Sequence, residues 1–283
     1  MRRAVRWAGI GCLALLACSE QPSTDAGDAT ENTGASETSD SETGGGDCVP
    51  LDPDAEPVVE TLTLTAADGS QVAATLARPG DATCRPGLIL VHQFNRDRQQ
   101  WAAQWSGAEP SFVAAGYVVL AIDLRGHGES SPYEGALTDL LTAPDQAPLD
   151  VAAALAALVA EPAVDTDKLA IVGTSIGANL AIVGSHQHPE LEVAVALSPR
   201  LDPVNQLAGS PASLDIDQLY CLAGELETDQ TSTCLGLAEQ GTGASEAWIF
   251  PGTSAHGVEL VDDFPETIPT VIAWLDAVLA VEG

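Results

Sequence analysis

Short apolar runs separated by polar turns recur along the chain from about residue 57 onward. Two of them, Val58–Thr65 and Gln71–Ala77, alternate polar and apolar positions around Asp68-Gly69, which predicts an antiparallel hairpin at a sheet edge. The later runs are almost continuously apolar, as expected for strands that are covered on both faces. These strands are expected at Gly87–Val91, Tyr117–Ile122, Lys168–Val172, Glu192–Leu197, Leu219–Ala223 and Ala247–Phe250.

Helical patterns lie between several of these strands. The expected helices are Trp101–Ala115, Leu149–Ala160, Ala178–Ser185 and Pro265–Val281. Strands that alternate with helices predict an α/β domain with a mostly parallel, doubly wound sheet of about eight strands and right-handed crossovers. We assign this single domain to residues 57–283. In such a sheet, ligands bind at the carboxyl ends of the strands.

The first residues have the pattern of an export signal. Three arginines among the first six residues precede an apolar run that is too short to span a bilayer. The run ends at Leu15-Leu16-Ala17-Cys18, which resembles the lipobox of bacterial lipoproteins. The resemblance implies a signal peptide over residues 1–17, cleavage before Cys18 and acylation of Cys18. The alternative is an ordinary signal peptide with a coincidental cysteine.

The lipobox resemblance also implies a location in the cell envelope. We expect a lipid-anchored protein, periplasmic or at the cell surface. Ser19 resembles the residue that follows the lipidated cysteine in lipoproteins sent to the outer membrane, so the outer membrane is favoured over the inner one.

Residues 18–56 are acidic and nearly free of large apolar side chains in their first part, which predicts a disordered tether without chemistry of its own. The formal net charge of the chain is −31, and three of the ten basic residues lie in the signal peptide. So strong a negative charge argues against nucleic acid and against anionic lipid surfaces as partners. We expect a monomer that acts on a small molecule.

Four cysteines lie after the lipobox, and four cysteines allow three pairings. Nearness in the sequence favours disulfides between Cys48 and Cys84 and between Cys221 and Cys234. Free thiols or a metal site are the alternatives, but the chain has no CxxC pair and no histidine close to these cysteines. Disulfides agree with export to an oxidising compartment.

The pentapeptide Gly173-Thr174-Ser175-Ile176-Gly177 is the strongest chemical signal in the chain. It stands between an expected buried strand and an expected helix. A serine on such a sharp turn is held above the sheet, and the two glycines leave room for close packing of strand and helix. The helix amino terminus then directs backbone N–H groups at whatever the serine attacks. This pattern predicts a nucleophile elbow.

With the elbow, three further segments resemble the α/β-hydrolase superfamily of serine esterases and dienelactone-hydrolase-like enzymes. Leu90-Val91-His92-Gln93-Phe94 stands where that family has its oxyanion loop. The turn from Asp123 to Ser130 matches the family pattern D-x-R-G-x-G-x-S. Pro251-Gly252-Thr253-Ser254-Ala255-His256-Gly257 stands where the family has its catalytic histidine. The resemblance covers the whole domain and implies a Ser-His-acid triad.

The resemblance implies His256 as the base that activates Ser175. Of the other histidines, His92 is better explained as bracing its own loop and His127 as a structural residue of its turn. His186 and His188 fit solvated residues at a helix end better than a metal pair. We expect no metal and no cofactor.

The family places the acid three residues after a glycine at the end of the seventh strand, which implies Glu227 here, where most relatives have aspartate. Asp229 is the second choice if the turn is longer. Asp202, after the sixth strand, is a third. A disulfide between Cys221 and Cys234 would stiffen the loop that positions this acid.

By the same resemblance, the backbone N–H groups of Phe94 and Ile176 form the oxyanion hole. Gln93 replaces the usual glycine of the family's His-Gly-X, so its amide is expected to shape the pocket or to add a donor. The segment Ser131–Pro148 is too short for a helical cap domain, which predicts an open pocket. Trp101 and Trp105 either line its mouth or pack against the sheet.

The resemblance therefore implies a serine hydrolase that cleaves carboxylic esters through an acyl-enzyme. A serine peptidase or an acyltransferase with the same triad is one alternative. The other is a non-catalytic lipoprotein that keeps the fold as a binding scaffold.

Overall fold

The computed structural model describes residues 48–211, 213–241 and 243–281, and these form an eight-stranded sheet with the order β1-β2-β4-β3-β5-β6-β7-β8. β1 and β2 pair antiparallel, as do β2 and β4, and all other neighbouring strands pair parallel. The strands are β1 (Val58–Thr65), β2 (Gln71–Arg78), β3 (Arg85–Val91), β4 (Val118–Ile122), β5 (Val164–Thr174), β6 (Val193–Leu197), β7 (Gln218–Gly224) and β8 (Glu246–Phe250).

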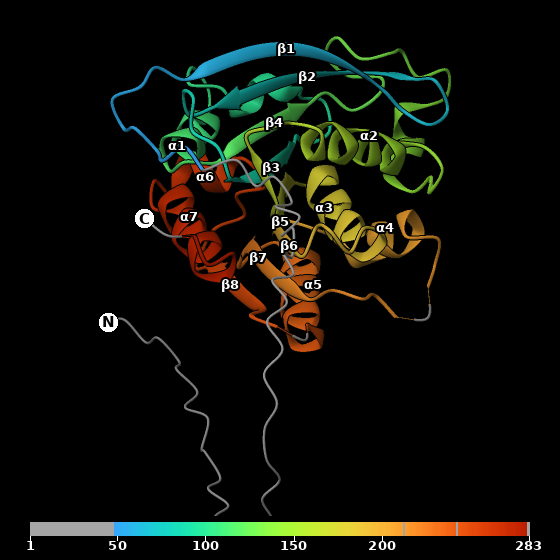
Figure 1. Ribbon diagram of the computed structural model, residues 1–283. Coiled ribbons are helices and arrows are strands. Elements are labelled where there is room, and N and C mark those ends of the chain that lie inside the picture. Colours follow the sequence, from blue (N-terminus) through green and yellow to red (C-terminus); the bar gives the residue numbers. More distant parts are fainter. Residues whose placement is uncertain (1–47, 212, 242, 282–283) are drawn as a thin grey trace, which may run out of the picture. The chain divides into compact units, whose positions relative to one another are not determined.

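Helices cover both faces of the sheet (Figure 1). One face packs against α2, α3, α4 and α5, and the other against α1, α6 and α7. The helices are η1 (Arg98–Trp101), α1 (Ala108–Ala114), η2 (Leu137–Leu141), α2 (Ala147–Val159), α3 (Ile176–Gln187), α4 (Leu201–Leu207), α5 (Thr228–Gln240), α6 (Glu259–Asp263) and α7 (Thr267–Val278), where η marks 3-10 helices.

The pleat of β5 explains why its sequence is apolar without alternation. Leu169 and Ile171 point into the core on the α3 side, whereas Ala170 and Val172 point into the core on the α7 side. Successive side chains of a strand face opposite sides of the sheet, so a strand between two helical layers needs apolar residues at every position. This burial holds the strand that ends at the elbow.

All eight expected strands are confirmed, with bounds that shift by a few residues. The helix expected at Trp101–Ala115 is wrong in its first half. There, η1 ends at Trp101, a turn follows, and α1 begins only after Gly107, whose φ of 66° is left-handed and interrupts a helix. Trp101 is fully buried, whereas Trp105 in the turn is 61% exposed.

Three helices were not expected from the sequence, namely α4, α5 and α6. The residues of α5 show why, since TDQTSTCLGLAEQ is rich in threonine and contains a glycine. These residues have low helix propensity, and only Thr233, Cys234 and Leu237 of this helix are buried. Packing against β7 and β8 therefore stabilises a helix that its own sequence does not favour.

Two disulfides join Cys48 to Cys84 and Cys221 to Cys234, the pairings favoured by nearness in the sequence. Beside the first, Val49 donates to Thr83 Oγ1 and accepts from the Thr83 amide, so the last residues assigned to the tether contact the domain. The signal peptide, the lipidation site Cys18 and the tether up to residue 47 lie outside the described residues. No helix in the described ranges is long and apolar enough to cross a membrane.

Candidate active site

Ser175 stands on a strained turn between β5 and α3. Its φ of 54° and ψ of −112° are rare for a residue with a side chain. The flanking glycines are sterically required. A Cβ on Gly173 would lie 2.0 Å from the carbonyl oxygen of Gly177, and one on Gly177 would lie 2.2 Å from the carbonyl oxygen of Val91. The turn therefore has the backbone geometry of the nucleophile elbow that the pentapeptide predicts.

His256 reaches Ser175 from the loop after β8. Its Nε2 lies 2.8 Å from Ser175 Oγ, and its Nδ1 lies 2.5 Å from Glu227 Oε1. The backbone N–H of His256 donates to Glu259 Oε2 at 3.0 Å, which anchors the loop to α6. Serine, imidazole and carboxylate thus form one hydrogen-bonded chain from the end of β5 through the β8 loop to the end of β7.

Glu227 is buried directly before α5, and both of its carboxylate oxygens have partners. While Oε1 faces His256, Oε2 accepts from the Gly224 amide at 3.0 Å and from Ser198 Oγ at 2.8 Å. These bonds hold the longer glutamate side chain in one orientation, with Oε1 directed at His256. Of the three acids considered from the sequence, the structure brings Glu227 alone to His256.

The two other candidate acids lie away from the imidazole. Asp229 is exposed, and its carboxylate pairs with Arg200 at 3.6 Å. Asp202 is exposed in the first turn of α4.

Ser198 is a site residue that the sequence analysis missed. It follows β6 directly, is buried, and has a φ of 60°. Its hydroxyl donates to Glu227 and accepts from the Gly257 amide at 2.9 Å, which connects the acid to the histidine loop. Its place after β6, between the strands that carry the nucleophile and the acid, is the signal that could have identified it.

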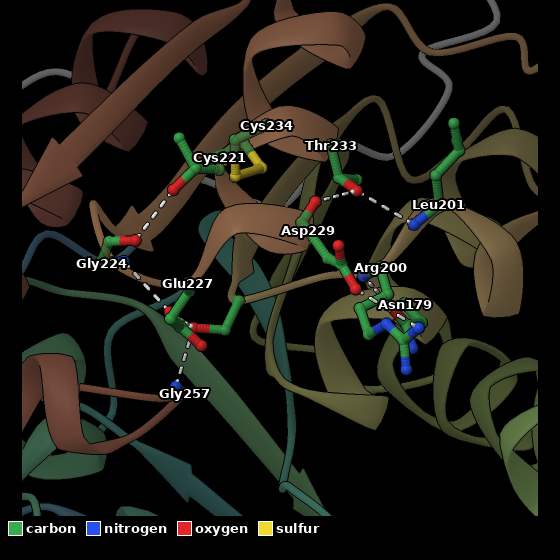
Figure 2. The surroundings of a disulfide bond; sticks show 12 residues. Asn179, Arg200, Leu201, Cys221, Gly224, Glu227, Asp229, Thr233, Cys234 and Gly257 are labelled. Carbon is green, nitrogen blue, oxygen red and sulfur yellow. Dashed lines mark hydrogen bonds and ion pairs between the residues drawn. A yellow bond between two sulfur atoms is a disulfide. The ribbon is translucent and has the colours of Figure 1, made fainter. Parts of the chain in front are cut away.

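The Cys221–Cys234 disulfide joins β7 to α5, and Glu227 lies between the two cysteines in the sequence (Figure 2). Both cysteines are buried. Closing a loop of this size contributes about 3 kcal/mol to the free energy of unfolding by the chain-entropy model. Directly before Cys234, Thr233 Oγ1 accepts from the Leu201 amide, which connects α5 to α4. The start of α5, and with it Glu227, is thereby attached to two neighbouring elements.

The backbone amides of Phe94 and Ile176 are available for an oxyanion. Among the described residues, neither donates a hydrogen bond to another protein group. The side chain of Gln93, expected from the sequence to shape the pocket or to add a donor, contacts the histidine loop. Its side-chain Oε1 accepts from the Val258 backbone N–H at 3.0 Å, and its backbone N–H donates to Gln100 Oε1 at 3.2 Å. Gln93 therefore connects the oxyanion loop to the histidine loop.

His92 and His127 are buried structural residues, as expected from the sequence. His92 Nε2 accepts from the Leu124 amide at 3.0 Å, and its Nδ1 faces the Gln93 carbonyl oxygen at 2.8 Å, which requires the neutral ring. His127 Nδ1 lies 3.1 Å from the Arg125 carbonyl oxygen. The two rings pack with their centroids 5.1 Å apart.

The neutral state of His92 predicts a loss of stability in acid. Burial lowers the pKa of His92 to about 4, below the value near 6.5 of an unfolded chain. Between these pH values the unfolded state binds more protons than the folded state. The contribution of neutral His92 to the free energy of unfolding is therefore complete above about pH 6.5 and is lost as the pH falls toward 4. It amounts to about 3 kcal/mol. Urea unfolding of the wild type and of His92→Gln at pH 7 and pH 4.5 measures it.

Between pH 7 and pH 4.5, the free energy of unfolding should decrease less for His92→Gln than for the wild type. His188→Gln, a change at the end of α3, serves as the control, and its free energy of unfolding should decrease as much as that of the wild type. Equal decreases in all three proteins would contradict this assignment.

Metal ligands are not gathered in the part of the chain that the structure describes: no group of three histidine, cysteine or carboxylate side chains could hold an ion there. His186 Nδ1 accepts from the Asp215 amide at 2.9 Å, a structural contact. The segment between β4 and α2 contains only the short helix η2, in agreement with the expected absence of a cap domain.

Solved structures with the same fold include several esterases. DcsB, solved in complex with its substrate analogue, has a TM-score of 0.63 and 13% identity over 79% of this chain and 100% of its own. Esterase Pf2001 of Pyrococcus furiosus has a TM-score of 0.58 and 20% identity over 82% and 96%. The acetyl xylan esterase of Paenibacillus sp. R4 has a TM-score of 0.63 and 16% identity over 82% and 87%. At these identities the likeness shows the fold.

A family model matches the sequence itself. It is described as X-Pro dipeptidyl-peptidase (S15 family) and covers residues 68–247, more than half of the chain. The matched range contains Ser175 and Glu227 and ends before His256. A search of curated proteins found no match. The chain therefore belongs to the S15 family, and its domain has the α/β-hydrolase fold.

Proposed function

We propose that this protein is a serine hydrolase that cleaves carboxylic esters of small molecules through an acyl-enzyme. The observation that carries the proposal is the unbroken hydrogen-bonded chain from Ser175 Oγ through His256 to Glu227, with 2.8 Å and 2.5 Å at its two links. All three roles of a triad have an occupant in bonding geometry. A scaffold that only binds would not need Glu227 held on both oxygens.

In the proposed reaction, Ser175 Oγ attacks the ester carbonyl carbon while His256 Nε2 takes its proton. The carbonyl oxygen becomes an oxyanion, and the amides of Phe94 and Ile176 donate to it, each contributing about 3 kcal/mol to the transition state. Glu227 stabilises the imidazolium and keeps its Nδ1–H oriented. His256 then gives the proton to the leaving alcohol. Water, activated by the same histidine, then attacks the acyl-enzyme, which releases the carboxylic acid product and restores Ser175.

The solved structures of the same fold that are esterases support esters as the substrate class. The family description nevertheless names a dipeptidyl-peptidase, so a peptidase with this triad is the second candidate. An aminoacyl-prolyl p-nitroanilide distinguishes the two, because its amide bond needs protonation of a much poorer leaving group.

The test is pre-steady-state hydrolysis of p-nitrophenyl esters of graded acyl length. We expect a burst of about one nitrophenolate per protein followed by slower turnover, as an accumulating acyl-enzyme requires. The dependence on chain length measures the acyl pocket. Cleavage of the prolyl anilide at a higher kcat/KM than any ester would favour the peptidase. If neither nitrophenolate nor nitroaniline were released from any of these substrates, the hydrolase would be refuted and a non-catalytic binding scaffold would be the remaining hypothesis.

We also propose that the mature protein is a lipoprotein of the cell envelope, anchored through Cys18. The lipobox resemblance and the two disulfides support this, since disulfides persist in exported proteins. Metabolic labelling with a radioactive fatty acid in a bacterial host should label the wild type and not Cys18→Ala. Equal labelling of both would contradict the anchor.

A further inference from the structure

A cavity of about 400 Å³, lined by both polar and apolar side chains, lies against the segments that carry the triad. This volume falls within the range of small-molecule sites. Val258 lines the cavity two residues after His256. Gln100 lines it as well, and its Nε2 donates at 2.9 Å to Oγ1 of Thr174, the residue before Ser175. The cavity is thus a direct neighbour of the proposed reaction site.

The wall of the cavity is held by its own hydrogen bonds. Asp97 Oδ1 accepts from the Gln99 amide at 2.9 Å, and Ser106 Oγ donates to the Gln100 carbonyl oxygen at 2.7 Å. Gln100 uses both ends of its amide, toward Gln93 and Thr174. These polar groups are occupied within the protein and shape the cavity rather than bind in it.

Three other polar side chains in the lining have free ends. The Asn95 amide, the Arg96 guanidinium and the Asp262 carboxylate make no hydrogen bond or close ion pair with other side chains of the described residues, although the charges of Arg96 and Asp262 attract each other. Arg96 instead lies over the Trp105 ring, 5.8 Å from its centroid. Donors and acceptors that the fold does not use are available to a ligand.

Trp105 gives the cavity a flat apolar surface beside these polar groups. It is the most exposed of the large apolar side chains in the described chain, at 61%. An exposed indole gains free energy when a ligand covers it, in proportion to the apolar area removed from water. A ligand that presents a flat C–H face with hydroxyl groups at its edge satisfies both parts of the lining.

The charges of the lining exclude other ligand classes. Asp97 and Asp262 repel anions, as does the net charge of the chain, −31. Arg96, whose guanidinium carbon lies 5.8 Å from the centroid of the Trp105 ring, repels a second cation from the indole, whose surface stays 61% exposed. A long acyl chain would desolvate the free amide, guanidinium and carboxylate without a partner for them. A neutral ring with several hydroxyl groups remains.

We propose that the cavity binds the alcohol part of O-acylated sugars, with the sugar ring on Trp105 and its hydroxyl groups at Asn95 and Asp262. The proposal rests on the proposed ester hydrolysis. In that reaction the acyl C–O bond breaks, the acyl group passes to Ser175 Oγ, and the sugar hydroxyl leaves with the proton from His256. Water then converts the acyl-enzyme to the carboxylic acid.

Three acetate esters with different alcohols test the proposal: 6-O-acetylglucose, ethyl acetate and acetylcholine. The wild type should have its highest kcat/KM for 6-O-acetylglucose. Trp105→Ala should lower that value about tenfold, mainly through KM, and leave ethyl acetate within about twofold. Leu235→Ala, an exposed apolar side chain on α5, is the control and should change neither substrate. An equal loss on all three esters, or a preference for acetylcholine, would overturn the sugar subsite.

Binding separates this proposal from the one on which it rests. Ser175→Ala should bind 6-O-acetylglucose in calorimetry, and the double variant Ser175→Ala/Trp105→Ala should bind it about tenfold more weakly. Binding by Ser175→Ala without any hydrolysis by the wild type would support the sugar cavity and refute the hydrolase. Hydrolysis of ethyl acetate by the wild type without sugar binding by Ser175→Ala would do the reverse.

Discussion

Replacing Ser175 with alanine should lower kcat for p-nitrophenyl acetate by about 10⁴- to 10⁶-fold, because the acyl-enzyme can no longer form. The fold should remain, since the side chain contributes no hydrogen bond besides the one to His256. A fluorophosphonate probe should label the wild type and fail to label the variant. Circular dichroism and the urea midpoint verify that the variant is folded.

Ser111→Ala is the matched control for this experiment. Ser111 is an exposed serine in α1 whose hydroxyl donates to the Gly107 carbonyl oxygen. It should keep both turnover and labelling. If Ser175→Ala retained more than a tenth of wild-type turnover, Ser175 would not be the nucleophile. If the probe labelled the wild type but the wild type hydrolysed no ester, Ser175 would be a reactive nucleophile and the proposed substrate class would be wrong.

Replacing Glu227 with glutamine should lower kcat by about 10³- to 10⁴-fold. The amide of glutamine can present an N–H to His256 Nδ1, which favours the tautomer with its proton on Nε2. That tautomer cannot accept the proton of Ser175, and the imidazolium also loses its buried counter-charge. Because Ser198 and Gly224 hold one carboxylate oxygen in place, the substituted side chain should stay in position.

Asp229→Asn is the matched control for Glu227→Gln. Asp229 is the second candidate acid, lies two residues after Glu227 and is exposed. Its ion pair with Arg200 joins two exposed side chains and contributes at most about 1 kcal/mol. We expect this variant to keep kcat within about twofold of the wild type. A large loss of kcat in Asp229→Asn together with a small loss of kcat in Glu227→Gln would assign the acid to Asp229 and refute the triad of Ser175, His256 and Glu227.

The strands and the elbow could be predicted from local sequence because their causes are local. A buried strand such as β5 needs apolar residues at every position, and Gly173 and Gly177 are required by contacts at the elbow turn itself. Together with the resemblance to α/β-hydrolases, the chain order of serine, acid and histidine and the position of each after its strand named Ser175 and His256 and put Glu227 ahead of Asp229 and Asp202 as the acid. These properties follow from nearest neighbours and from the order of the elements along the chain.

Other features were beyond the sequence because they depend on which loops meet. The helix α5 is stabilised by packing, in spite of its threonines and its glycine. Trp101 and Trp105 lie four residues apart, yet one is in the core and the other at a cavity, because the left-handed Gly107 ends the turn before α1.

The amino-acid sequence by itself determined the strand pattern, the strained elbow and the order of the catalytic residues. Only the tertiary structure decided how these residues are supported. Ser198 connects Glu227 to Gly257, and Gln93 connects the oxyanion loop to Val258, each across a large separation in sequence. Such contacts form only when the carboxyl ends of parallel strands meet at one edge of the sheet, and no local pattern records which loop will face which.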